Sequence, residues 1–219
     1  MPPIDRKAMR ASLRSTHVRM MKCWLTTNPF PTNPIEYHES EWAGWIDRVK
    51  GGAEAALNAI PQLPAGCPPD YYAEEIVRER ELSRIMLAAL TVGMWAKLED
   101  FLRRCIRAWN YDALSPIQYD CHKIVDFVKC FDQAVGIKLD DLPRYEYANA
   151  IRVLANTFKH NNGRYKPDSF PINTTIAKRW GIEERQKVDY EGLPFADLLL
   201  DCGAFCGELS ERVRSKLTI

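Results

Sequence analysis

A chain of 219 residues with 46% hydrophobic and 27% charged residues has the composition of a globular protein, and it can bury about 70% of its unfolded surface. The formal net charge of +1 argues against a uniformly basic nucleic-acid-binding surface, but it allows a local basic cleft. No apolar run reaches the roughly 18 to 20 residues of a membrane span, and the N-terminus lacks the apolar core of a signal peptide. Seven cysteines without regular spacing indicate reduced thiols, so we expect a cytoplasmic protein that does not bind membranes.

The first 60 residues predict helices separated by a proline-rich break. Apolar residues recur at loose helical spacing over residues 4–25 and again over about 35–60. The prolines within 28–34 and 61–69 cannot continue a helix. We therefore expect residues 1–60 to form a helical extension that caps the core, forms a small subdomain or mediates dimerisation.

The clearest helical pattern runs from Asp70 to about Asn110. Asp70 stands where an N-cap belongs, Glu74 follows in the first turn, and apolar residues then recur with a period of 3.6. Such a helix would be about 60 Å long if straight. It is therefore expected either to kink or to leave the core over its early part.

Three further helices complete the predicted bundle. One runs from Ser115 to about Val135 and stops at Gly136; a second begins at Leu142-Pro143 and stops at Asn161-Asn162-Gly163. The segment from Arg164 to Glu191 shows turn signals, no clear helix and at most a short strand near Val188, and Leu193-Pro194 opens the last helix. The predicted fold class is all-α, with residues 70–219 forming a four-helix bundle that has a long irregular loop before its last helix.

The cysteines favour core packing over metal binding. Cys202 and Cys206 lie four residues apart on one predicted helix, and Cys121-His122 and Cys130 lie on another. Each cysteine also fits the apolar face of its helix, where a thiol acts as a small hydrophobic group. A zinc site built from Cys202, Cys206 and His122 is the alternative interpretation. We predict no metal and no other cofactor.

A polar stripe on the helix before Gly163 is the strongest candidate for chemistry. Arg152, Asn156 and His160 are spaced by four residues, so they share one face of a helix whose other face is apolar. Lys159 flanks His160. A surface stripe with a histidine that interacts favourably with the helix dipole would have the same pattern, and this structural interpretation stays open.

Two segments resemble HEPN-domain proteins, which are all-helical modules of toxin–antitoxin and phage-defence systems. Residues 155–163, with the sequence Ala-Asn-Thr-Phe-Lys-His-Asn-Asn-Gly, resemble the end of the family's signature helix. Residues 95–102, Trp-Ala-Lys-Leu-Glu-Asp-Phe-Leu, resemble its earlier helix, in which an acidic residue interrupts an apolar stripe. The resemblance covers about residues 75–215, and Ala155 stands where the family commonly has arginine.

This resemblance implies metal-independent RNA cleavage, usually at a dimer interface, in which the ribose 2′-OH attacks the adjacent phosphate. His160 would transfer the proton, Arg152 would hold the phosphate, Asn156 would position it, and Glu99 would orient Arg152 or His160 or pair with Arg103. The cations expected to bind RNA are Lys159, Arg164, Arg103 and Arg107. Arginines on one helix are also typical of a solvated face.

Two functions remain open from the sequence. The first is a homodimeric, metal-independent endoribonuclease of the toxin or phage-defence type, which acts on RNA and is regulated by an antitoxin or other protein partner. The second is a catalytically inactive HEPN-like module, in which Ala155 marks the loss of activity and the helical surface binds a protein partner or a nucleotide.

Overall fold

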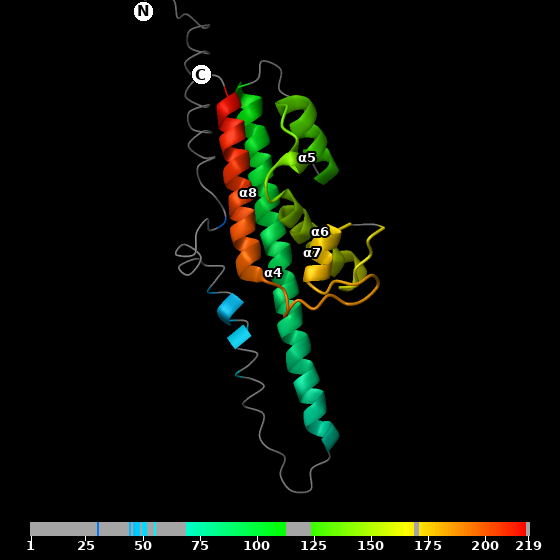
Figure 1. The fold of residues 1–219 in the computed structure, drawn as a ribbon. Coiled ribbons are helices and arrows are strands. Elements are labelled where there is room, and N and C mark those ends of the chain that lie inside the picture. Colours follow the sequence, from blue (N-terminus) through cyan, green and yellow to red (C-terminus); the bar gives the residue numbers. More distant parts are fainter. Residues whose placement is uncertain are drawn as a thin grey trace, which may run out of the picture. The chain divides into compact units, whose positions relative to one another are not determined.

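The structure, a computed structural model, describes residues 30, 44, 46–48, 50–51, 55, 69–112, 124–168 and 171–217 (Figure 1). Within these ranges the secondary structure is helical, apart from one isolated antiparallel β-bridge between Arg164 and Lys187. The all-α fold class is therefore confirmed for the described part of the chain. The predicted helical extension, residues 1–60, lies almost entirely outside these ranges, although Ile46 to Arg48 have helical backbone.

The helices follow the predicted order with one addition. Their bounds are α4 Pro69–Asp112, α5 Ile124–Cys130, the π-helical turn η1 Phe131–Val135, the 3₁₀ turn η2 Leu139–Asp141, α6 Tyr145–Asn161, α7 Thr174–Arg179 and α8 Phe195–Lys216. Sequence patterns did not predict α7. It lies inside the segment expected to be irregular, and it begins where the Asn173 side chain accepts hydrogen bonds from the backbone N–H groups of Thr175 (2.9 Å) and Ile176 (3.4 Å), an N-cap of the usual kind.

Two predicted helix stops are confirmed by their backbone angles. Gly136 has φ +66° and ends η1, while Asn162 and Gly163 have φ +51° and +74° and end α6. Left-handed residues stop a helix because the next N–H turns back onto the last turn. The N–H of Gly163 accordingly donates to the carbonyl of Thr157 at 3.1 Å.

The chain divides into two compact units. Unit 1 takes Met1–Thr32, Ala96–Tyr145 and Asp201–Ile219, and unit 2 takes Asn33–Trp95 and Glu146–Leu200. The long helices α4 and α8 each contribute residues to both units. None of the described helices is long and apolar enough to cross a membrane.

Unit 1 is built on the second part of α4 and the main part of α8, which run parallel to each other (Figure 1). Its core is made of fully or almost fully buried side chains at the helical spacing expected of an inward face. They are Leu98, Phe101, Leu102, Cys105, Phe127, Phe131, Cys202, Phe205, Cys206 and Leu209. The ring of Tyr145 packs on Phe205 with a centroid distance of 6.2 Å.

The four cysteines that the structure describes are core residues of unit 1, as predicted. Cys105, Cys130, Cys202 and Cys206 are buried free thiols, and no group of three metal-ligating side chains occurs in the described ranges. Burial raises the pKa of Cys105, Cys202 and Cys206, since an apolar interior disfavours a thiolate. The alternative zinc site also required His122, which lies outside the described residues.

Unit 2 is built on the first part of α4 together with α6, α7 and the segment that precedes α8. Leu87, Met94, Ile151 and Leu154 have 0 to 1% of their surface exposed. Tyr190, from the segment before α8, is also buried, and its hydroxyl donates a hydrogen bond to the carbonyl of Leu154 at 3.0 Å. A buried phenol needs such a partner because an unpaired hydroxyl is costly to bury.

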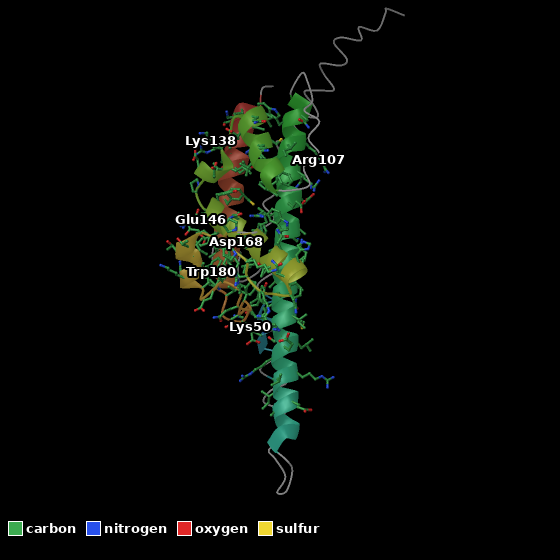
Figure 2. All side chains as sticks on the ribbon, turned by 90° about the vertical axis from the view of Figure 1, so that its right-hand side faces the viewer. Lys50, Arg107, Lys138, Glu146, Asp168 and Trp180 are labelled. Carbon is green, nitrogen blue, oxygen red and sulfur yellow. The ribbon has the colours of Figure 1, made fainter. Side chains whose placement is uncertain are left out.

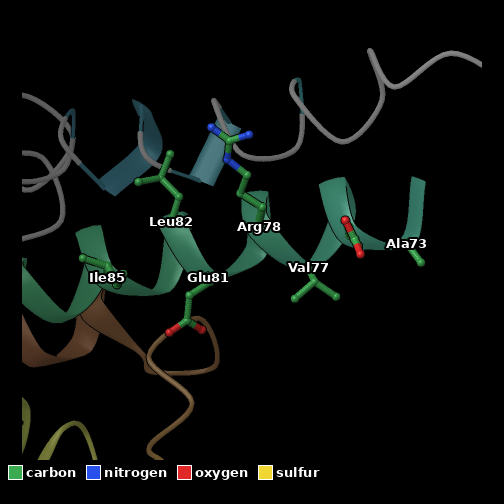
Figure 3. Close-up of a pocket in the computed structure, with 7 residues that line it drawn as sticks. Ala73, Val77, Arg78, Glu81, Leu82 and Ile85 are labelled. Atoms are coloured by element: carbon green, nitrogen blue, oxygen red, sulfur yellow. The ribbon is translucent and has the colours of Figure 1, made fainter. Parts of the chain in front are cut away.

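The early part of α4 exposes apolar side chains. Val77, Leu82, Ile85 and Met86 have 66, 51, 44 and 38% of their surface exposed. Val77, Leu82 and Ile85 line a surface hollow of about 760 Å³. Around this part of α4, Arg78 and Leu82 extend to one side of the helix, and Val77 and Glu81 extend to the other (Figure 3). Of the two outcomes expected for this long helix, the structure has an early part that leaves the core.

Burial along α4 predicts unequal effects of the same substitution. Leu98→Ala removes a side chain that is 1% exposed and should lower the free energy of unfolding by about 2 to 5 kcal/mol, because a cavity replaces it. Leu82→Ala, at a half-exposed position of the same helix, should change it by less than about 0.5 kcal/mol. Urea unfolding of both variants measures the difference, and equal losses would contradict the assigned burial.

The buried thiols predict a loss of stability at high pH. In the native state Cys105, Cys202 and Cys206 keep their protons above the ordinary thiol pKa of 9.0, whereas the unfolded chain loses them there. The unfolded state then binds fewer protons, so the free energy of unfolding should fall above pH 9, by about 1.4 kcal/mol per pH unit for each thiol. Urea unfolding between about pH 8 and 10.5 tests this slope. Substituting Cys202 by alanine should remove the contribution of one thiol, about 1.4 kcal/mol per pH unit, from this slope.

Candidate functional site

The end of α6 displays the predicted histidine to solvent. Lys159 and His160 occupy the last turn of the helix, and both side chains are exposed. Asn156, one turn earlier, is half-buried. The opposite face of α6 is buried through Ile151 and Leu154, so packing against the core fixes which residues face outward.

Arg152 is held by a neighbour on its own helix. Its Nε and Nη2 atoms donate to Oδ1 of Asn149 at 3.0 and 2.8 Å, and Nδ2 of Asn149 donates to the carbonyl of Pro171 at 3.3 Å. Asn149 lies three residues toward the start of α6, whereas His160 lies eight residues toward its end, about 12 Å along the axis. The guanidinium group of Arg152 is therefore directed away from His160 within one chain.

Ala155 is fully buried, at 0% exposure. The resemblance to HEPN proteins noted in the sequence would place an arginine at this position. A cation at this position would have to enter the core of unit 2, where a buried charge without a partner is strongly unfavourable. The packing of α6 thus gives a physical reason for an alanine here.

The chain beyond α6 is tied to a segment that precedes α8. The N–H of Val188 donates to the carbonyl of Gly163 at 2.9 Å, the N–H of Tyr165 to Gln186 at 3.0 Å and the N–H of Arg185 to Tyr165 at 2.7 Å. These bonds form the isolated bridge between Arg164 and Lys187. They fix Lys187 close to the end of α6, although it lies far from that helix in the sequence.

Four cationic or protonatable residues lie on these two hydrogen-bonded segments: Lys159, His160, Arg164 and Lys187. The side chains of the first three are exposed, and Nη1 of Arg164 donates to the carbonyl of Arg185 at 3.2 Å. The carbonyl-rich end of a helix attracts cations, which accounts in part for this group. Acidic residues stand nearby as well, since Glu184 pairs with Arg185 at 3.3 Å. The group is a local basic patch on a chain of almost zero net charge.

The predicted site residues of α4, which are Glu99, Arg103 and Arg107, belong to unit 1. Oε1 of Glu99 pairs with Nη2 of Arg103 at 2.7 Å, and the guanidinium of Arg103 lies 5.7 Å from the ring centre of Phe127. Among the uses foreseen for Glu99, the observed one is the pair with Arg103. Arg107 is exposed on the surface of α4 (Figure 2). The roles of Glu99, Arg103 and Arg107 toward RNA stay predictions.

A cavity of about 170 Å³ within unit 2 adjoins the end of α6; we call it the Glu81 cavity. Three segments supply its walls. They are α4 with Glu81, Arg84, Ile85 and Ala88, the end of α6 with Phe158, Asn162 and Gly163, and the later segment with Lys187, Val188 and Tyr190.

Charged groups surround one carboxylate in this cavity. Oε1 of Glu81 accepts a hydrogen bond from Nη2 of Arg84 at 2.5 Å and lies 3.8 Å from Nζ of Lys187. Both cations approach the same oxygen. In the described part of the chain no hydrogen bond reaches Oε2 of Glu81, which leaves this oxygen able to accept one. These side chains are 27 to 46% exposed, so the ion pairs add little to stability.

No sequence pattern indicated the Glu81 cavity. Glu81 and Arg84 have the spacing of an ordinary surface ion pair on a helix. Lys187 and Tyr190 stood in a segment predicted to be irregular. Hydrogen bonds between Gly163 and Val188 and between Tyr190 and Leu154 help to bring these residues together.

The chain matches no protein-family model, no curated protein and no solved structure. The function of the chain is therefore inferred from the helices and the site described above.

Two glycine substitutions test how the site is held. Gly163 has φ +74° with open space where a Cβ would stand, whereas Gly207 lies inside α8 with the same open space and no positive φ. Gly163→Ala should lower the free energy of unfolding by about 1 to 2 kcal/mol because alanine is strained in that conformation. Gly207→Ala should raise it by about 0.5 to 1 kcal/mol. Thermal unfolding measures both, and a stabilising Gly163→Ala would contradict the left-handed helix stop.

Proposed function

We propose that this protein is a metal-independent endoribonuclease with a HEPN-like helical bundle, and that its RNA site lies at the end of α6. One observation carries the proposal. His160 is exposed at the end of α6 beside Lys159, and the same turn is hydrogen-bonded to the segment that bears Lys187. A proton-transfer group within a fixed basic patch is what RNA cleavage by the 2′-OH requires.

The reaction needs few groups. The neutral imidazole of His160 accepts the proton of a ribose 2′-OH, whose oxygen forms a bond to the adjacent phosphorus. The bond from phosphorus to the 5′ oxygen breaks, and the leaving oxygen takes up a proton from water. The products are a 2′,3′-cyclic phosphate and a 5′-hydroxyl end. Cations near the phosphorus stabilise the charge that builds on its oxygens.

The cations divide into two groups in this proposal. Lys159 and Arg164 stand within four residues of His160, and they are assigned the first contact with the phosphate backbone. Arg152 remains the predicted phosphate holder and Asn156 the predicted positioner. Arg152 can reach a phosphate beside His160 only after its guanidinium leaves Asn149 or when a second copy of the chain supplies it. A homodimeric site is therefore part of the proposal, as is a protein partner that restrains the activity.

The second candidate function is a catalytically inactive module that binds a nucleotide or a protein. Two observations favour it: the buried Ala155 at the position of the family's arginine, and the hydrogen bonds that hold Arg152 on Asn149. The two candidates share the site and differ in whether His160 transfers a proton.

Cleavage in the presence of EDTA decides between them. Purified full-length protein is incubated with a pool of single-stranded and structured RNA, beside His160→Ala and Lys138→Ala. Lys138 is an exposed lysine of unit 1 that has no role in the proposed site. We expect cleavage by the native protein and by Lys138→Ala, with cyclic phosphate ends, and a loss of at least about 100-fold in His160→Ala.

The control for this experiment is the fold of each variant, which circular dichroism and thermal unfolding verify. Cleavage that persists unchanged in His160→Ala, or that stops when EDTA is added, would overturn the proposal. If neither the native protein nor the variants cleave RNA, but the native protein retains RNA on a filter, the inactive module replaces the endoribonuclease as the proposed function.

A further inference from the structure

We propose that the Glu81 cavity binds a guanine base, either of a free guanine nucleotide or of RNA. The proposal uses residues of unit 2 alone and stands on the size, the hydrogen-bonding groups and the walls of the cavity.

The volume suits one flat group. Pockets for drug-sized ligands are about 300 to 1,000 Å³, and a volume near 170 Å³ is too small for a whole nucleotide. A single purine base, with the sugar and phosphate left outside, is of the right size. Arg84 and Lys187, which line the cavity, are partly exposed, so the cavity opens to solvent near them.

The arrangement of charges selects guanine among the bases. Guanine presents two adjacent donors, N1–H and the N2 amino group, and two acceptors, O6 and N7. A carboxylate can accept from both donors, and Oε2 of Glu81 is not engaged by Arg84 or Lys187 in a hydrogen bond. Arg84 or Lys187 can donate to O6 or N7, the commonest cation contact to this base. Adenine would place the unprotonated N1 against the carboxylate, which is repulsive.

The walls of the cavity are mostly apolar, and Ile85 and Phe158 are the more exposed of the apolar side chains. Phe158 and Tyr190 contact each other edge to face with a centroid distance of 6.2 Å, and Ile85, Ala88 and Val188 are apolar. Proteins that read single-stranded RNA place bases against aromatic and apolar side chains while polar groups read the base edge. Here α4 and the segment before α8 each supply both polar and apolar side chains, and α6 adds Phe158.

The cavity is preorganised by backbone hydrogen bonds. The N–H of Val188 is bonded to Gly163, and the hydroxyl of Tyr190 to the carbonyl of Leu154. Two walls are thus fixed before a ligand arrives, which lowers the entropy lost on binding. For RNA as the source of the base, the inference rests on the proposed function, since Asn162 in the wall closely follows His160 in the chain. For a free nucleotide it does not.

Calorimetric titration of the purified full-length protein with GMP, AMP, CMP and UMP in EDTA tests the proposal. GMP should bind at least about tenfold more tightly than the other three, given about 1 to 3 kcal/mol for a good two-point base contact. Glu81→Gln should reduce the preference for GMP over AMP at least about fivefold, since an amide cannot accept from both donors of guanine. Ala88→Leu should abolish binding of all four by filling the cavity. Lys166→Ala, an exposed lysine that does not line the cavity, should bind as the native protein does.

Equal binding of the four nucleotides, no binding of any, or an unchanged preference in Glu81→Gln would overturn the proposal. The preference is a ratio, so a general loss of stability in Glu81→Gln does not imitate the expected result. An RNA with every guanosine replaced by adenosine separates the two sources: it should bind more weakly than the parent RNA only if the cavity takes a base of RNA. If the protein binds GMP but does not cleave RNA, the guanine site is supported and the endoribonuclease proposal is rejected. If it cleaves RNA but does not bind GMP, the endoribonuclease proposal is supported and the guanine site is rejected.

Discussion

The hydrogen bond from the N–H of Val188 to the carbonyl of Gly163 is the contact on which the site depends. Gly163 can accept it because α6 stops there in a left-handed turn that exposes the carbonyl. Through this bond a segment that is distant in sequence brings Lys187 beside the last turn of α6 and Tyr190 beneath it. The bonds of Tyr165 with residues 185 and 186 and of Tyr190 with Leu154 hold the same segment, which supplies one wall of the Glu81 cavity.

The charged groups of the site contribute to function more than to stability. The ion pairs of Glu81 with Arg84 and Lys187 are partly exposed, so water screens them and each adds at most about 1 kcal/mol. Stability comes instead from the buried faces of the helices and from anchors such as Tyr190 on Leu154. Charges that the fold does not need are free to be arranged for a ligand, which is the usual condition of a binding site.

Arg152 illustrates how local contacts limit what a helix position can do. Its spacing from His160 places both on one side of α6, so the sequence pattern groups them in one candidate site. Asn149 nevertheless binds the guanidinium toward the start of the helix, and a side chain turned in one direction cannot serve a site in the other. The basic patch at the end of α6 is therefore defined by Lys159, Arg164 and Lys187 together with His160.

The sequence by itself determined the longer helices and two of the helix ends. The 3.6-residue period predicted α4 and α8. Gly136 and Gly163 predicted the ends of η1 and α6. Both kinds of signal are local and act within a few residues. The Asn173 cap of α7 is also local, but this helix is too short to show a period. The stripe on α6 was likewise visible as a pattern, whereas the roles of its residues were not.

Only the tertiary structure decided which residues meet at the site. Lys187 and Glu81 are far apart in the chain, and no periodicity relates them; they meet because backbone hydrogen bonds and a buried tyrosine bring their segments together. The direction of Arg152 and the pairing of Glu99 with Arg103 depended in the same way on which neighbour offered an acceptor. Local signals in a sequence determine backbone conformation, while the contacts between distant segments depend on how the whole chain buries its apolar surface.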